Sequence, residues 1–169
     1  MKTTTLQRIT MPGRTWWLDE QYRLGTSTAF AWGLKRGKTL FKSRPNMQRI
    51  EIFDNEEFGR VLALDGMMQL STKYEYIYHE MLTHPAVLAH PKPLHALIIG
   101  GGDGGVLREL IKYPFERIVM VEIDRAVIEL CEKFLPSVSN RAFRDPRLEI
   151  IIADAAAYIK TGRHEFDIV

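Results

Sequence analysis

Only one cysteine, Cys131, occurs among the 169 residues, so the sequence cannot form a disulfide within the chain. It also has no run of eighteen apolar residues, as a membrane-spanning helix needs, and its first residues, MKTTTLQRITMPGR, lack the apolar core of a signal peptide. We therefore expect a soluble cytoplasmic protein with no membrane partner, in which Cys131 is a small buried apolar side chain.

Internal repeats, heptads and low-complexity tracts are missing as well, and the composition of 46% hydrophobic and 26% charged residues is that of a globular domain. The net charge is only +2, but residues 1–44 carry nine lysines and arginines against two acidic residues. A nucleic-acid-binding arm would explain this excess. The basic residues from Lys35 to Arg44 are spaced through strand-like apolar positions, however, which favours a solvated face and no nucleic-acid partner.

The first part of the sequence, residues 1–72, consists of short apolar runs separated by turn residues. The runs are STAFAWGLKRGKTLFKS, with Gly37 near its turn, and then MQRIEIF, RVLALDG and MMQLS. The first run predicts a hairpin, and the others predict a meander of antiparallel strands. We therefore expect a small antiparallel β domain.

The periodicity changes in the second part, residues 73–169. KYEYIYHEMLTHP predicts a helix that ends at Pro85, in which apolar residues follow the helical spacing at Tyr74, Ile77 or Tyr78, Met81 and Leu82. After it, the apolar runs HALIIG, RIVMVEI, LEIIIAD and FDIV alternate with helical patterns. Apolar strands separated by helices predict a doubly wound α/β domain with a parallel sheet, ending at its fourth strand.

A glycine-rich loop, LIIGGGDGG, follows the first of these strands. Gly100, Gly102 and Gly105 match G-x-G-x-x-G between a strand and a helix, and Glu122 ends the next strand twenty residues after Gly102. Such glycines allow a tight turn and a close approach of the backbone to a ligand, and a carboxylate at the position of Glu122 can accept hydrogen bonds from ribose hydroxyls. The pattern predicts a nucleoside-containing ligand; a tight turn without a ligand is the alternative.

An acidic residue, Asp103, lies in the middle of this loop. In a pocket of low dielectric constant its carboxylate would repel a pyrophosphate by several kcal/mol, which disfavours NAD and FAD. The sulfonium and amine of an adenosylmethionine derivative would instead be attracted. Asp103 also fits a residue that caps the following helix, and the two roles are compatible.

Two further segments, the end of the third strand and HEMLTH, contain candidate binding residues. Asp154 ends the third strand before Ala155, where it can accept a hydrogen bond from an adenine amino group or cap the next helix; both interpretations stay open. HEMLTH resembles a zinc motif, but His79 and His84 are five residues apart, which rotates them by about 140° around a helix. We expect no metal site.

Together these motifs resemble one family. LIIGGGDGG, MVEID and IIADAA, with QRIEIF, FGRVLALDGMMQLS and EYIYHEMLTHP, are similar to the spermidine synthases, the polyamine aminopropyltransferases. The resemblance implies a β domain followed by a methyltransferase-like Rossmann domain. It also implies transfer of the aminopropyl group of decarboxylated S-adenosylmethionine, a co-substrate rather than a cofactor, to putrescine or a similar amine, with release of methylthioadenosine. Family members commonly form homo-oligomers through the β domain.

The resemblance also assigns roles to individual positions. Nucleoside-binding residues by this likeness are Gln48, Gly100, Gly102, Glu122, Asp154 and Ala155. Residues that contact the substrates, chiefly their amines, are Gln48, Tyr78, His79 and Asp103. The resemblance thus implies that the glycine loop receives a cation.

The family's catalytic base begins a D-S/T-x-D-P type segment just past the fourth strand, whereas this sequence ends at FDIV, with Val169 as its last residue. Asp167 begins that strand, so we expect no catalytic base within the chain and place the family's base beyond Val169. We expect the chain to be inactive unless a longer chain or a second chain supplies the missing part.

Two other functions stay open as alternatives. A non-catalytic nucleoside-binding or assembly module of the same fold is one. An S-adenosylmethionine-dependent methyltransferase is less favoured, because no acid precedes the glycines in LIIG.

Overall fold

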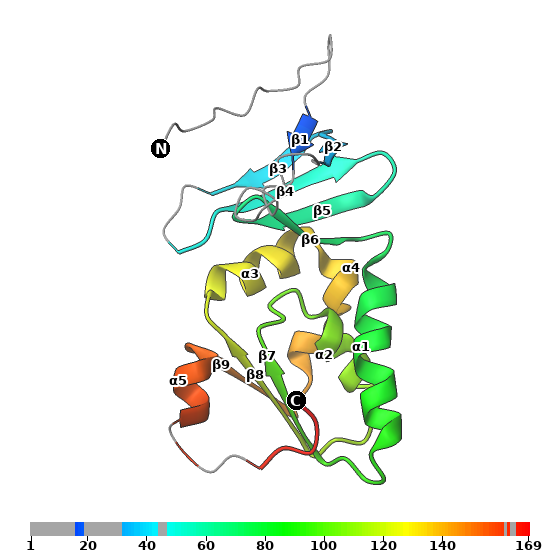
Figure 1. Ribbon diagram of the computed structural model, residues 1–169, viewed down its shortest axis with the longest axis vertical. Coiled ribbons are helices and arrows are strands. Elements are labelled where there is room, and N and C mark those ends of the chain that lie inside the picture. Colours follow the sequence, from blue (N-terminus) through cyan, green and yellow to red (C-terminus); the bar gives the residue numbers. More distant parts are fainter. Residues whose placement is uncertain (1–15, 19–31, 44–46, 161, 163–164) are drawn as a thin grey trace. The chain divides into compact units, whose positions relative to one another are not determined.

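The computed structural model describes residues 16–18, 32–43, 47–160, 162 and 165–169. It divides the chain into two compact units, with the boundary between Ser71 and Thr72. Figure 1 shows β-strands in the first unit and strands with helices in the second. No helix among the described residues is long and apolar enough to cross a bilayer.

The first unit contains two antiparallel sheets. One pairs β1 (Trp16–Leu18) with β2 (Gly33–Lys35), and the other has the order β3 (Thr39–Lys42), β4 (Ile50–Asn55), β5 (Gly59–Leu64) and β6 (Met67–Ser71). Asp65 and Gly66 join β5 to β6 with φ values of +51° and +82°, the left-handed conformation that an Asp-Gly turn favours. The predicted meander is confirmed.

The hairpin predicted around Gly37 is wrong, because β2 pairs with β1 and β3 pairs with β4. The Gly37 backbone N–H donates to the Asp54 carbonyl at 2.8 Å, and the Asp54 N–H donates to the Lys38 carbonyl at 2.9 Å. A Cβ on Gly37 would lie 2.6 Å from the Asp54 carbonyl oxygen. The glycine therefore lets residues 36–38 run close beside β4 instead of turning back on β2.

The second unit is built on a parallel sheet with the order β7 (His95–Ile99), β8 (Arg117–Glu122) and β9 (Leu148–Ile152). Ile168 makes a single parallel bridge to Ala96 beside β7, at the position expected for a fourth strand. The helical elements are α1 (Glu75–Ala89), α2 (Gly105–Leu110), α3 (Arg125–Phe134), α4 (Pro136–Ser139), η2 (Ala142–Arg144) and α5 (Ala155–Lys160).

Both faces of this sheet are covered, which explains the apolar strands. On one face Ala96, Ile98 and Met120 pack with side chains of α1, α2 and α3. On the other face Leu97 and Val119 pack against the segment that includes α5. Figure 1 shows α1 and α2 on one side of the strands and α5 on the other. The predicted α/β class is confirmed.

Helix α1 differs from its prediction in where it ends and in its buried face. It continues through Pro85 to Ala89. Proline has no N–H to donate to the Met81 carbonyl, but Met81 is exposed, so water can satisfy that carbonyl while Val87 packs into the core. The predicted apolar positions, Tyr74, Ile77, Tyr78, Met81 and Leu82, are exposed; Glu75, His79, Thr83 and Val87 form the buried row. Charge pairing rather than hydrophobic spacing selects the inward face.

Candidate functional site

The glycine loop between β7 and α2 makes a tight turn. Gly100, Gly101 and Gly104 all have φ of +78°, a conformation that side chains strongly disfavour. Gly102 has a different requirement, because an added Cβ would lie 3.0 Å from the Glu122 carboxylate. These contacts bring the loop backbone onto the carboxyl end of β8.

Glu122 connects the loop to the next strand. The backbone N–H of Gly102 donates to its Oε2 at 3.1 Å, and the backbone N–H of Asp124 donates to its Oε1 at 3.0 Å. The residue is buried, yet it lines the adjacent cavity. A carboxylate oxygen can accept more than one hydrogen bond, so Glu122 can hold the loop and still accept from a ligand hydroxyl.

A cavity of about 280 Å³ lies at the carboxyl ends of β7, β8 and β9. Its lining includes four of the predicted nucleoside-binding residues, Gly100, Glu122, Asp154 and Ala155. Ile99 and Ile123 add apolar surface, and both are partly exposed. The cavity therefore combines a carboxylate at each of two strand ends with apolar walls, which suits a flat heterocycle joined to a polyol.

Asp154 occupies the position predicted for it and caps α5, since its Oδ1 accepts from the Ala157 backbone N–H at 3.0 Å. The capping interpretation is therefore correct. The interpretation of Asp154 as an adenine contact stays open as well, because Asp154 also lines the cavity.

Asp103 accepts a hydrogen bond from the first residue of α2 and contacts a charged partner, although the N-cap of that helix is Gly104. Its Oδ1 accepts from the Gly105 backbone N–H at 2.7 Å and lies 3.3 Å from Nε2 of His79. Burial alone would raise the pKa of Asp103, but the hydrogen bond and charge of His79 and the Gly105 N–H together hold it below its ordinary value. The loop therefore carries an ionised carboxylate.

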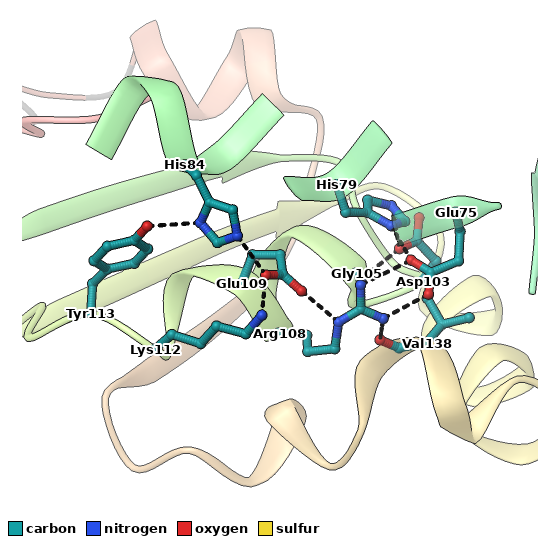
Figure 2. Close-up of polar contacts among 10 residues, drawn as sticks. All are labelled: Glu75, His79, His84, Asp103, Gly105, Arg108, Glu109, Lys112, Tyr113 and Val138. Carbon is teal, nitrogen blue, oxygen red and sulfur yellow. Dashed lines mark hydrogen bonds and ion pairs between the residues drawn. The ribbon is translucent and has the colours of Figure 1, made fainter. Parts of the chain in front are cut away.

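His79 is buried between two carboxylates, as Figure 2 shows. Its Nδ1 lies 2.5 Å from Glu75 Oε2, and its Nε2 faces Asp103. Burial by itself lowers the pKa of His79, but hydrogen bonding and charge from Asp103 and then from Glu75 raise it above its ordinary value. A Cβ on Gly105 would lie 2.2 Å from the His79 ring, so the third motif glycine is needed for this approach.

The sequence reasoning missed the residues behind His79. Arg108 donates to Glu75 Oε1 at 2.7 Å, to Glu75 Oε2 at 3.1 Å and to Glu109 Oε1 at 2.7 Å. It also donates to the Val138 carbonyl at 2.7 Å. The i, i+4 spacing of Glu75 and His79 was the available signal, since those positions share a helix face.

A second cluster continues from Glu109. His84 Nε2 lies 3.0 Å from Glu109 Oε2, Lys112 also pairs with Glu109, and the Tyr113 hydroxyl lies 2.7 Å from His84 Nδ1. His79 and His84 therefore have separate partners (Figure 2). Among the described residues no group of three or more His, Cys, Asp or Glu side chains is arranged so that it could hold a metal ion.

Two of the predicted substrate-contacting residues lie outside these contacts. Tyr78 is exposed, with its ring edge-on to His79 at a centroid distance of 5.3 Å. The Gln48 carbonyl accepts from Ser43 Oγ at 3.3 Å in the first unit. The role of the Gln48 side chain stays a prediction.

The last residues of the sequence are not part of the cavity lining. Asp167 Oδ2 accepts from the backbone N–H groups of Leu94 and His95 at 2.7 and 2.8 Å, at the end of β7 opposite the glycine loop. Val169, beyond which the family resemblance places the catalytic base, is 78% exposed. The position of that base stays a prediction, and Asp167 holds the start of β7 instead.

Two family profiles cover most of the sequence. The spermidine synthase tetramerisation domain matches residues 17–72, and the spermine/spermidine synthase domain matches residues 75–169.

Curated relatives carry corresponding names. A polyamine aminopropyltransferase of Clostridium tetani is 44% identical over 133 residues, which are 78% of this chain and 47% of the relative. Polyamine aminopropyltransferase 1 of Pseudomonas aeruginosa is 49% identical over 131 residues, 77% of this chain and 46% of the relative. The chain thus spans about half the length of the curated relatives it matches.

Solved structures agree with these relatives. The spermidine synthase of Thermotoga maritima is 39% identical, with a TM-score of 0.82 over 90% of this chain and 53% of that chain. A spermidine synthase in complex with the transition state analogue AdoDATO has the same identity of 39% and TM-score of 0.82, over 90% of this chain and 51% of that chain. The resemblance inferred from the motifs is confirmed: this chain belongs to the spermine/spermidine synthase family.

Proposed function

We propose that this chain supplies the nucleoside site and part of the amine site of a polyamine aminopropyltransferase. The complete protein transfers the aminopropyl group of decarboxylated S-adenosylmethionine to putrescine or a similar amine. The observation that carries the proposal is an ionised carboxylate, Asp103, at the centre of a nucleotide-type glycine loop. Such a loop repels a pyrophosphate and attracts an ammonium or sulfonium group.

The adenosine part of the substrate fits the cavity at the strand ends. Glu122 accepts from the ribose hydroxyls, and Asp154 accepts from the adenine amino group beside Ala155. Gly100 lets the ligand approach the backbone, because an added Cβ there would meet no protein atom within 4 Å and would project into open space. Gln48 is assigned to nucleoside binding by the family resemblance alone.

The sulfonium and the ammonium groups of the substrates are cationic, whereas the nitrogen that attacks is a neutral amine. The nitrogen lone pair of the acceptor amine attacks the aminopropyl carbon next to sulfonium, the carbon–sulfur bond breaks, and its electron pair neutralises the sulfur of methylthioadenosine. The new ammonium loses a proton to a base that we assign to a segment outside this chain. Asp103 and Tyr78 hold and orient the amines, with His79 acting through Asp103, and orientation alone contributes to the rate.

The proposal needs no cofactor or metal, since the sulfonium itself supplies the leaving group. Residues 1–72 form the domain through which copies assemble, and residues 73–169 form the Rossmann-like domain. The match of residues 17–72 to a tetramerisation domain supports a homo-oligomer. We place the protein in the cytoplasm.

Replacement of Glu122 by glutamine tests the nucleoside site. We expect affinity for methylthioadenosine to fall by about 1 to 3 kcal/mol, the scale of a charge-assisted hydrogen bond, measured by calorimetry. Glu149→Gln is the matched control, because Glu149 is exposed on β9 and pairs only at the surface with Arg117. Unchanged affinity in a folded Glu122→Gln protein would remove Glu122 from the site.

A further inference from the structure

Four charged side chains meet where α1 packs against the glycine loop and α2. They are Glu75 and His79 on α1, Asp103 on the loop and Arg108 on α2 (Figure 2). Their side chains are 7%, 4%, 20% and 14% exposed, respectively. Asp103 is the most exposed of the four, so the charges behind it are shielded from water while it remains accessible.

The surroundings of His79 favour its doubly protonated form. Each ring nitrogen faces a carboxylate oxygen, Nδ1 at 2.5 Å from Glu75 and Nε2 at 3.3 Å from Asp103. An ionised carboxylate only accepts hydrogen bonds, so these two neighbours favour a proton on each ring nitrogen and raise the pKa of His79 above its ordinary value. The charged groups that face the ring directly are Glu75 and Asp103, and Arg108 acts through Glu75.

Arg108 in turn fixes Glu75. Two of its nitrogens donate to the two Glu75 oxygens, at 2.7 and 3.1 Å. Since Glu75 Oε2 also receives the proton of His79, the carboxylate is held from both sides. A two-pronged contact of this kind sets orientation as well as charge.

The chain of contacts ends on one oxygen of Asp103. Oδ1 receives the Gly105 backbone N–H and faces His79, whereas no other residue among those described donates a hydrogen bond to Oδ2. One carboxylate oxygen is therefore occupied by these two neighbours, and the second is left for a ligand.

We propose that Glu75 and Arg108 are positioning residues for the amine of decarboxylated S-adenosylmethionine. Arg108 holds Glu75, Glu75 holds the His79 ring, and His79 holds Oδ1 of Asp103, so that Oδ2 is the oxygen that accepts the substrate ammonium. This role rests on the proposed function of the site.

Two ligands separate the amine contact from the nucleoside contact. Decarboxylated S-adenosylmethionine and methylthioadenosine share the adenosine group, but only the first carries an ammonium. In calorimetric titrations of Glu75→Gln, we expect affinity for decarboxylated S-adenosylmethionine to fall about tenfold and affinity for methylthioadenosine to stay within twofold. Glu80→Gln is the matched control: it removes a carboxylate from the same helix next to His79, and neither affinity should change.

The His79 ring gives a second readout that a general loss of packing would not produce. In ¹⁵N spectra recorded against pH, both ring nitrogens of His79 should stay protonated above the ordinary histidine pKa of 6.5. Glu75→Gln should lower that pKa, because Glu75 is one of the two carboxylates that raise it. If Glu75→Gln does not fold, Arg108→Lys replaces it, because lysine keeps the charge but loses the two-pronged contact.

The outcomes separate the two proposals. If the unaltered chain binds no methylthioadenosine, the proposed function fails and the positioning role fails with it. If methylthioadenosine binds but the variant loses both ligands equally, loses neither, or leaves the His79 pKa unchanged, only the positioning role is overturned.

Discussion

Replacing Arg108 by methionine is expected to lower the free energy of unfolding of the second unit by about 3 to 5 kcal/mol, the usual cost of removing one partner from a buried ion pair. Arg108 lies between two buried carboxylates, Glu75 and Glu109, and no other cation contacts Glu75 among the described residues apart from His79. Methionine preserves much of the packing of the arginine stem, so the loss reports mainly on the uncompensated charges.

The measurement is urea unfolding followed by the helical circular dichroism signal, because the helices that the structure describes all lie in residues 72–169. Arg117→Met is the matched control, since Arg117 and Glu149 form a half-exposed pair that should contribute no more than about 1 kcal/mol. Equal losses in the two variants would contradict a structural role for the buried charges.

The stability lost in Arg108→Met should depend on pH, because Arg108 contacts the titratable carboxylate of Glu109. Although burial raises the pKa of Glu109, its hydrogen bonds from Lys112 and Arg108 lower it below the ordinary value of 4.5. A depressed folded-state pKa adds stability above the unfolded pKa, and that stability is lost as pH falls through the folded value. The loss in free energy of unfolding caused by Arg108→Met should therefore be largest above pH 4.5 and become smaller at lower pH.

Asp103→Asn is expected to reduce the affinity for decarboxylated S-adenosylmethionine about a hundredfold, or about 2 to 3 kcal/mol, with little effect on methylthioadenosine. Asparagine can still accept from the Gly105 N–H, so this hydrogen bond is preserved while the charge that attracts the ammonium is removed. The measurement is calorimetric titration of both ligands.

Glu122→Gln is the reference for this second prediction. It should weaken both ligands by a similar factor, because both contain a ribose. If Asp103→Asn also weakens both ligands equally, or weakens neither, Asp103 does not receive the amine.

Much of the fold could be predicted from the sequence, because the patterns of apolar residues that identify its strands and helices are local. Alternation of short runs identified β4, β5 and β6, and apolar strands alternating with helices identified the parallel sheet. The order of glycines and acids around Gly102 and Glu122 also located the loop and the strand end that the structure brings together. Each of these signals depends on residues close in sequence or on a recurrent strand–loop–helix unit.

The predictions failed where tertiary contacts outweigh local preference. Pro85 normally ends a helix, but burial of Val87 beyond it favours another turn. Hydrophobic spacing selected the exposed face of α1, because the pattern could not show that Glu75 would meet Arg108, thirty-three residues later in the chain.

The most direct measurement compares three adenosine ligands on the same protein: decarboxylated S-adenosylmethionine, methylthioadenosine and NAD. A glycine loop that carries the ionised Asp103 should bind the cationic ligand most tightly, the neutral one less tightly and the pyrophosphate least. The order should hold in calorimetric titrations at neutral pH. NAD binding as tight as that of decarboxylated S-adenosylmethionine would contradict a loop that receives cations.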